Sequence, residues 1–233
     1  ADEDILRSAA GETVDGYTHQ LYFSYPKTGG AASLINAFVK KLNRKVTIHT
    51  SREATSVEKT EGGWRVAAGG RNFEGDALVS CIPVNLLTEM YKGIDHQIAV
   101  CGSELSYNNI MIAAATVAED RAGDNFAFMI ADREVIFHRL SRLDFLGESY
   151  HRDGTATYLM EYTYRDDDPL KGWDDDKLRG AFAEGLQKIG FIRSPEEIIS
   201  FTLKRFPFAY VIYDLGHKEN MTSIRSYFRE QGV

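Results

Sequence analysis

Arg139, Tyr210 and Tyr213 are the residues of this sequence whose types and surroundings best suit contact with a ligand. Arg139 follows His138 at the end of an apolar segment, where a guanidinium can bind an anionic group or form a surface salt bridge. Tyr210 and Tyr213 lie in an aromatic-rich stretch from Phe206 to Tyr213. Apolar walls with a few polar tips are typical of pockets, but core packing explains the same pattern. Both interpretations stay open for each site.

Two acidic clusters, residues 166–168 and 174–176, have the carboxylates that a cation site needs. The first cluster precedes Pro169 and fits a turn. The second fits the start of a helix, where carboxylates complement the positive end of the helix dipole. The six histidines are scattered without ligand spacing, so the sequence predicts no metal site.

Familiar catalytic and nucleotide-binding motifs are absent from the 233 residues. There is no G-x-G-x-x-G, G-x-x-x-x-G-K-[ST], C-x-x-C, H-E-x-x-H or G-x-S-x-G. A nucleophile and its base cannot be selected from the sequence, so the catalytic residues are unknown at this stage.

The elements that position these residues fall into two units, and the first is organised around residues 25–83. Gly29 and Gly30 permit a sharp turn before a helix over residues 31–42, whose apolar side chains recur on one face. The pattern then predicts strands over residues 46–50, 56–58, 64–66, 71–74 and 77–82. The last of these lacks alternation, as in strands covered on both faces, and Pro83 ends it before a helix over residues 84–91.

The second unit begins near residue 92. A long apolar run over residues 110–118 predicts a central strand. Further strands are predicted over residues 125–130, 135–140, 155–164 and 198–206, with helices starting near residues 174 and 220. The predicted fold class is α+β, with an antiparallel or mixed sheet and packed helices beside a small β-meander.

Composition bounds the class of protein. The net charge of −7 argues against a nucleic-acid-binding surface, and no apolar run reaches the roughly 20 residues of a membrane-spanning helix. Cys81 and Cys101 are too few for a disulfide scaffold. Cys81 lies in the apolar 77–82 segment and is expected to be buried and reduced, which favours a cytoplasmic compartment. The N-terminus has neither Met nor a signal-peptide layout, so we expect a piece of a longer protein.

A resemblance rests on the order of several short motifs. Gly29-Gly30 precedes a helix, V-T-I-H-T follows at 46–50, V-E-K-T-E-G-G-W-R-V at 57–66, and D-A-L-V-S-C-I-P at 76–83. In this order the segments resemble the middle of flavin-dependent amine-oxidase-type enzymes, which include protoporphyrinogen oxidases, monoamine oxidases and UDP-galactopyranose mutases. Residues 134–141, 158–161 and 205–210 are similar to substrate-domain strands of the protoporphyrinogen-oxidase and mutase-like branch.

The resemblance implies an interior fragment of such a protein. Residues 1–91 would be part of a Rossmann-like FAD-binding domain, and residues 92–233 most of a substrate-binding domain. The family's N-terminal G-x-G-x-x-G unit and its glycine-rich C-terminal segment are absent from the sequence. FAD is therefore expected in the full-length parent and not to be held tightly by this chain.

The resemblance also assigns roles to individual residues. Gly29 and Gly30 match the family's loop near the flavin. Ala54, where the family usually has valine, matches the position whose backbone contacts the adenine end of FAD. Arg139, Tyr210 and Tyr213 become the candidates for substrate binding.

Three functions remain open. The first is an FAD-dependent oxidoreductase acting on a small molecule. The second is a mutase-like isomerase of a nucleotide sugar, for which Arg139 and Arg205 would have to face a diphosphate. The third is a non-catalytic substrate- or partner-binding module. The 77–82 segment is expected to form an exposed or re-paired edge, through which the chain could form a homo-oligomer.

Overall fold

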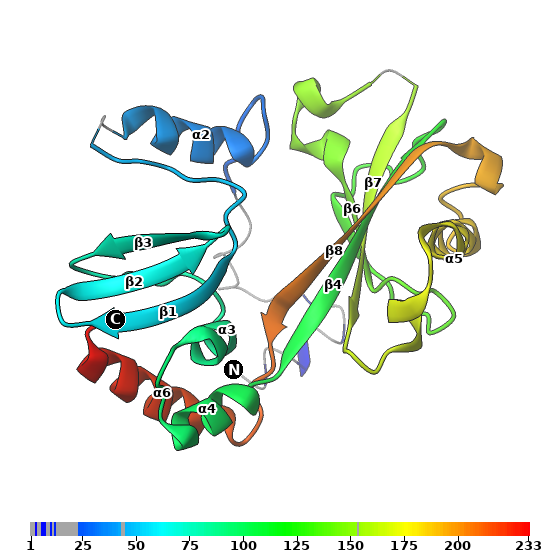
Figure 1. The fold of residues 1–233 in the computed structure, drawn as a ribbon. Coiled ribbons are helices and arrows are strands. Elements are labelled where there is room, and N and C mark those ends of the chain that lie inside the picture. Colours follow the sequence, from blue (N-terminus) through cyan, green and yellow to red (C-terminus); the bar gives the residue numbers. More distant parts are fainter. Residues whose placement is uncertain are drawn as a thin grey trace.

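The computed structural model describes residues 23–42, 45–152 and 154–233, together with residues 3, 6, 7, 10 and 12. Figure 1 shows a three-stranded sheet and a five-stranded sheet with helices packed on them. Every neighbouring pair of strands in the two sheets is antiparallel. The predicted α+β fold is confirmed.

The five-stranded sheet is built around β4 (Tyr107–Val117). This strand pairs with β7 (Ala156–Tyr164) on one side and β8 (Ile198–Val211) on the other. β6 (Arg139–Arg142) and β5 (Ala127–Met129) continue the sheet beyond β7. The apolar run that predicted a central strand lies in β4, so that prediction is confirmed.

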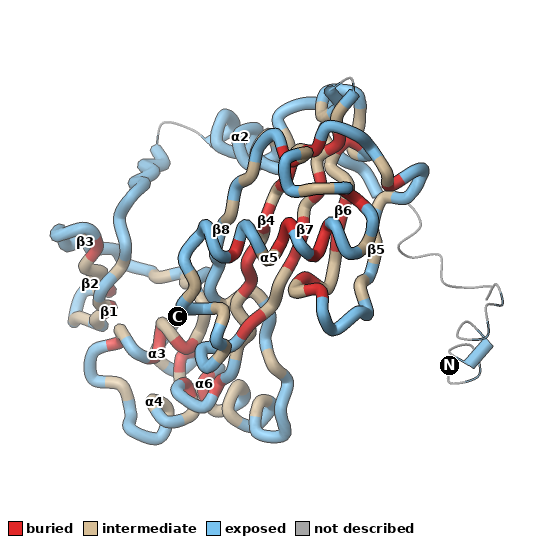
Figure 2. Tube along the Cα trace, turned by 90° about the vertical axis from the view of Figure 1, so that its right-hand side faces the viewer, coloured by how far each residue is buried: buried red, intermediate tan, exposed pale blue. Residues whose placement is uncertain are grey.

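Helix α5 (Asp175–Lys188) covers one face of this sheet, and the buried residues of the strands lie behind it in Figure 2. The helix begins where Asp174 accepts a hydrogen bond from the Lys177 amide at 2.8 Å, as the acidic cluster predicted. Phe182 and Leu186 are wholly buried against the strands. A Cβ at Gly185 would lie 2.7 Å from the Phe137 ring, so only glycine permits this close approach.

The second strand predicted after residue 125 starts later than expected. β6 begins at Arg139, and most of residues 135–138 form a loop although Val135 and Phe137 are buried. The Phe137 ring stacks on Phe182 with centroids 5.9 Å apart. The apolar pattern of this segment therefore reflects packing against α5 and not strand pairing.

The three-stranded sheet is the predicted meander. β1 (Ala54–Thr60), β2 (Gly63–Ala68) and β3 (Arg71–Gly75) are joined by tight turns, and Gly69 and Gly70 both have positive φ. Helices α3 (Val84–Met90), α4 (His96–Ser103) and α6 (His217–Gln231) pack beside it. Their shared core includes residues from distant parts of the chain: Val57, Trp64, Leu87, Tyr91, Leu105, Ile224 and Phe228. The division at residue 91 stays a prediction; α6 packs with elements on both sides of it.

Helix α2 (Ala32–Lys41) confirms the helix predicted over residues 31–42, but none of its residues is buried. Phe38, on its apolar face, is 65% exposed. Figure 2 shows most of the helix in the colour of exposed residues. Its apolar face has no covering layer among the residues that the structure describes.

Two predicted strands are wrong. Residues 46–50 and 77–82 run through the structure without strand pairing. The 77–82 segment is exposed, as expected of an unpaired edge, and Val79 is 86% exposed. Cys81, predicted to be buried, is an exposed free thiol for the same reason. A strand needs a hydrogen-bonding neighbour, and none is present for either segment within the described ranges.

Phe137→Ala should lower the free energy of unfolding by about 3–5 kcal/mol, because it empties a wholly packed site between the sheet and α5. Urea denaturation measures this change. Phe38→Ala is the matched control: it truncates an exposed ring and should leave stability nearly unchanged. An equal loss in the two variants would contradict the packing described here.

Tyr158 makes stability depend on alkaline pH. Burial raises its pKa from 10.0 to about 12, and the Asp120 carboxylate, 3.2 Å from the hydroxyl oxygen, adds to the shift. The fold favours the neutral phenol, so stability is unaffected below about pH 10 and falls as pH rises towards 12, where only the unfolded chain ionises. Tyr158→Phe should flatten this decline in denaturation curves, whereas exposed Tyr213→Phe should not.

Candidate functional site

The face of the five-stranded sheet opposite α5 carries the charged site. The register aligns Arg139 on β6 with Glu161 on β7, Glu161 with Ile112 on β4, and Ile112 with Lys204 on β8. Residues directly opposite each other in a sheet lie on the same face. The next row, Leu140, Met160, Ala113 and Leu203, packs towards α5. The row from Arg139 to Lys204 therefore crosses the opposite face.

Arg139 and Glu161 form an ion pair within this row. Arg139 Nε donates to Glu161 Oε1 at 2.9 Å, and Nη2 donates to the same oxygen. The Glu161 side chain is 5% exposed and that of Arg139 is 42% exposed. Arg139 thus makes the salt bridge that the sequence left open, but the partner is buried and much of the guanidinium is still exposed.

Tyr210 and Tyr213 lie far from Arg139. Tyr210 pairs with Asn108 on β4, four residues along β4 from the partner of Lys204, which is about 13 Å along the strand, and β8 lies three strand spacings, or about 14 Å, from β6. Tyr213 follows the strand and is 80% exposed, with its ring edge-on to His217 at 4.8 Å. The structure does not bring the three predicted substrate-side residues together.

β8 is irregular before Tyr210. Phe208 has φ of 55° in a shift of register, and its amide donates to Asn109 Oδ1 at 3.2 Å. Positive φ is unusual for a bulky residue and costs energy that the surroundings must offset. In the sequence, Pro207, which cannot donate a ladder hydrogen bond, is the residue that could have indicated this bulge.

Arg205 and Arg139 lie on opposite faces of the sheet. Arg205 is paired with Met111, in the register of the α5 side, and its Nη1 lies 2.7 Å from Asp175 Oδ1. The arrangement in which Arg139 and Arg205 share a diphosphate is therefore wrong. Adjacent residues of a strand point to opposite faces, and the sequence alone could not place the two strands in register.

The acidic clusters serve the turns and helix starts that the sequence favoured. Asp168 accepts hydrogen bonds from Tyr162 Oη at 2.5 Å and from the Leu170 amide at 2.8 Å. Asp166 lies 2.6 Å from Lys171 Nζ, which lowers the pKa of the Asp166 carboxyl. Within the described residues, no three His, Cys, Asp or Glu side chains gather as a metal site.

Gly29 and Gly30 form the predicted turn, with φ of 77° and 61°. The Gly30 amide donates to Tyr150 Oη at 2.8 Å, and Tyr150 Oη donates to the Pro26 carbonyl at 3.0 Å. Tyr150 ends the short 3₁₀ helix Glu148–Tyr150 and joins the segment before α2 to the part of the chain that forms the five-stranded sheet. The sequence offered no signal for Tyr150, because the contact spans 120 residues.

Ala54 begins β1, as predicted, and pairs with Ala68 of β2. It is half-buried, and because β1 is an outer strand, its backbone lies at the edge of the three-stranded sheet. Its contact with a cofactor stays a prediction.

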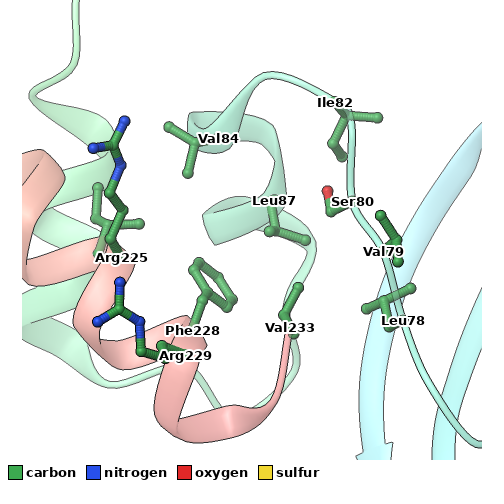
Figure 3. Close-up of a pocket in the computed structure, with 11 residues that line it drawn as sticks. Leu78, Val79, Ser80, Ile82, Val84, Leu87, Arg225, Phe228, Arg229 and Val233 are labelled. Atoms are coloured by element: carbon green, nitrogen blue, oxygen red, sulfur yellow. The ribbon is translucent and has the colours of Figure 1, made fainter.

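A groove of about 430 Å³ lies between residues 78–82, α3 and α6. Figure 3 shows Leu78 and Val79 on one side and Arg225 and Arg229 of α6 across from them. Phe228 lies between the two sides. One wall of the groove is thus the mainly apolar, unpaired 77–82 segment, and the opposite wall carries two cations of α6.

Comparison with known proteins gives a family and a fold. The family model for flavin-containing amine oxidoreductase matches residues 9–219. No curated protein sequence matches the chain. Among the described residues, no helix has both the length and the apolar character needed to cross a membrane.

Solved structures match over most of this chain but less than half of their own. A reduced UDP-galactopyranose mutase has a TM-score of 0.78 at 15% identity, covering 90% of this chain and 46% of that one. A putative protoporphyrinogen oxidase from Exiguobacterium sp. 255-15 has a TM-score of 0.70 at 15% identity, covering 84% and 43%. A putrescine oxidase bound to putrescine has a TM-score of 0.60 at 15% identity, covering 81% and 43%. At these identities the likeness establishes the fold alone.

Tyr150→Phe should release the Gly29-Gly30 turn, since it removes the hydroxyl that the Gly30 amide and the Pro26 carbonyl share. Hydrogen exchange at the Gly30 amide should become roughly tenfold faster, as expected for the loss of one net hydrogen bond. Amides of β4 serve as the internal control and should keep their rates. Unchanged exchange at Gly30 would show that Tyr150 does not hold the turn.

Proposed function

Because this chain belongs to the flavin-containing amine oxidoreductase family, we propose that it is part of an FAD-dependent oxidoreductase that oxidises a small molecule. Residues 1–91 belong to its FAD-binding domain, and residues 92–233 to its substrate-binding domain. The observation that carries this proposal is the uncovered apolar face of α2 together with the unpaired segments 46–50 and 77–82.

A covering layer of a larger domain would pack on α2 and on residues 46–50 and 77–82. Leu34, Ile35 and Phe38 on α2, Ile48 after it and Val79 in the 77–82 segment are all exposed. Large exposed apolar surfaces in a soluble protein mark an interface. Coverage of less than half of the matched structures is consistent with a missing layer.

The residues present fit one part of an FAD site. Gly29 and Gly30 hold positive φ beside an apolar helix, and Ala54 offers a sheet-edge backbone, which suits close approach of a cofactor. A glycine-rich loop for the pyrophosphate is absent from the 233 residues. We therefore place FAD in the full-length parent and expect this chain alone to hold it weakly.

The flavin supplies the redox chemistry of such enzymes, and the protein binds the substrate and excludes water. In this chain Arg139, held by buried Glu161, is the group we assign to substrate binding. Tyr210 lies about 13 Å along the sheet from the charged row and Tyr213 lies farther, so both would meet another part of the substrate or of the parent. A general acid or base is not assigned.

A flavin-dependent isomerase of a nucleotide sugar is the second candidate. It is favoured by the fold likeness to UDP-galactopyranose mutase, which has a TM-score of 0.78. In that case the diphosphate would have to bind without Arg205, which faces α5 and is paired with Asp175.

A non-catalytic role is the third candidate for the isolated chain. The unpaired 77–82 segment and the apolar face of α2 could bind a second copy of the chain. The two free cysteines suit a reducing, cytoplasmic compartment, which stays a prediction.

Flavin content tests the proposal. The complete reading frame should purify with visible flavin absorbance and about one FAD per chain, and the 233-residue chain should purify colourless. A reading frame that starts at Ala1, or a complete protein that binds no flavin when FAD is added, would refute the enzyme proposal.

Phe38→Glu tests whether the apolar face of α2 is an internal interface of the parent. The isolated chain should keep its stability, because Phe38 is already exposed, whereas the complete protein should lose most of its bound FAD. Asn36→Glu adds the same charge at a polar position of the same helix and should leave FAD content unchanged. Normal FAD content in the Phe38 variant would count against the interface.

A further inference from the structure

The sheet face opposite α5 differs in charge from the protein as a whole. Of the strand residues whose register puts them on this face, Arg139, Glu161 and Lys204 are the charged ones. The face therefore carries two cations and one anion, on a chain of net charge −7. The other strand residues of the face are mainly apolar or carry hydroxyls, and they include Ile110, Ile112, Ala114, Leu159, Met129, Phe206, Thr116, Thr157, Thr163, Thr202, Ser141 and Ser200.

Glu161 is only partly satisfied. Glu161 is 4% exposed, and its Oε1 accepts both hydrogen bonds from Arg139. Oε2 is buried and has no hydrogen-bond partner among the described residues. A buried carboxylate oxygen without a donor is costly, so it marks a place where another donor is expected.

Lys204 is the second cation of the row and is exposed. Within the described part of the chain, its ammonium has neither an ion-pair nor a hydrogen-bond partner. Glu161 and Ile112 separate it from Arg139, which corresponds to three strand spacings, or about 14 Å between the outer Cα atoms. The two long basic side chains thus lie on either side of Glu161 and Ile112.

We propose that Arg139 and Lys204 bind the anionic group of a mainly apolar substrate on this face, and that Glu161 positions Arg139 and accepts, through Oε2, a hydrogen bond from a hydroxyl group of that substrate. This inference rests on the proposed function, since it names the substrate class of the same site. The anionic group is a carboxylate or a phosphate, either of which can accept hydrogen bonds from a guanidinium and an ammonium.

The alternative substrate class is a free amine cation. Such a group would meet two positive side chains and one carboxylate that Arg139 already neutralises. The apolar residues of the face beside the charged row suit a hydrocarbon body, and the hydroxyls along the face suit the polar rim of a site. Charge and apolar area together therefore favour an amphipathic anion.

The test uses the 233-residue chain with four probes that share one alkyl length: octanoate, octyl phosphate, octylammonium and octanol. Two-dimensional amide NMR follows the signals of β4, β6, β7 and β8, and the same spectra report whether each variant is folded. At least one anion should shift signals around Ile112 and Glu161, and octylammonium and octanol should not. The stronger anion identifies the carboxylate or the phosphate as the group recognised.

Arg139→Met and Lys204→Met should each weaken binding of that anion about tenfold or more, the loss expected for a charge-assisted hydrogen bond. Arg205→Met is the matched control, because it removes the same charge from the adjacent position of β8 on the opposite face. It should change affinity by less than about twofold. Glu161→Gln should lower the affinity for the anion, because Arg139 loses the carboxylate that positions it. Arg139→Lys should bind the anion little better than Arg139→Met does, which shows that the positioned guanidinium is needed and not the positive charge alone.

Three results would overturn the proposal. They are the absence of anion binding by the folded chain, equal binding of octylammonium, and losses in Arg205→Met as large as in the other two variants. None of them depends on flavin, so failure here is distinct from failure of the proposed function. A flavin-containing parent with a chain that prefers octylammonium would keep the oxidoreductase and reject the anionic substrate.

Discussion

Burial of apolar surface is the constraint on which this structure depends, and it is satisfied unevenly. Around β4 it is met in full: small and large side chains pack against α5, and the sheet needs no further layer on that side. Around α2 it is not met, since an amphipathic helix with a well-formed apolar face buries none of its residues. A stripe of that kind gains stability only when something covers it. The uncovered stripe is therefore the physical observation that supports our proposal that this chain is part of a larger flavoprotein.

The antiparallel register of the five strands decides the geometry of the candidate site. It places Arg139, Glu161, Ile112 and Lys204 in one row, although they are up to 92 residues apart along the sequence. The same register sends Arg205 to the face of α5. A shift of one position along β8 thus separates Lys204, which lies on the face of the charged row, from Arg205, which forms an ion pair with α5. Tyr150 also connects residues that are distant in the sequence, because its hydroxyl joins the Gly29-Gly30 turn to the unit that carries the charged row.

Local patterns predicted the elements that are stabilised locally. The β-meander follows from its glycine turns, α5 from its acidic start and apolar face, and β4 from its apolar run. Prediction failed where a partner decides the outcome. Residues 46–50 and 77–82 have strand composition but no pairing strand among the residues that the structure describes, and residues 135–138 have apolar composition because they pack on a helix. Arg139 could be selected for its type, but Glu161 and Lys204 could not be added before the strand register was known.

The central claim is that this chain contributes part of a cofactor domain whose remaining layer covers residues 77–82 and α2. Hydrogen exchange at the amides of residues 78–82, compared between the 233-residue chain and the complete protein, tests it most directly. The account predicts exchange close to that of an unfolded peptide in the isolated chain and strong protection in the complete protein, where a neighbouring strand accepts these hydrogen bonds. Equal and rapid exchange in both would contradict it.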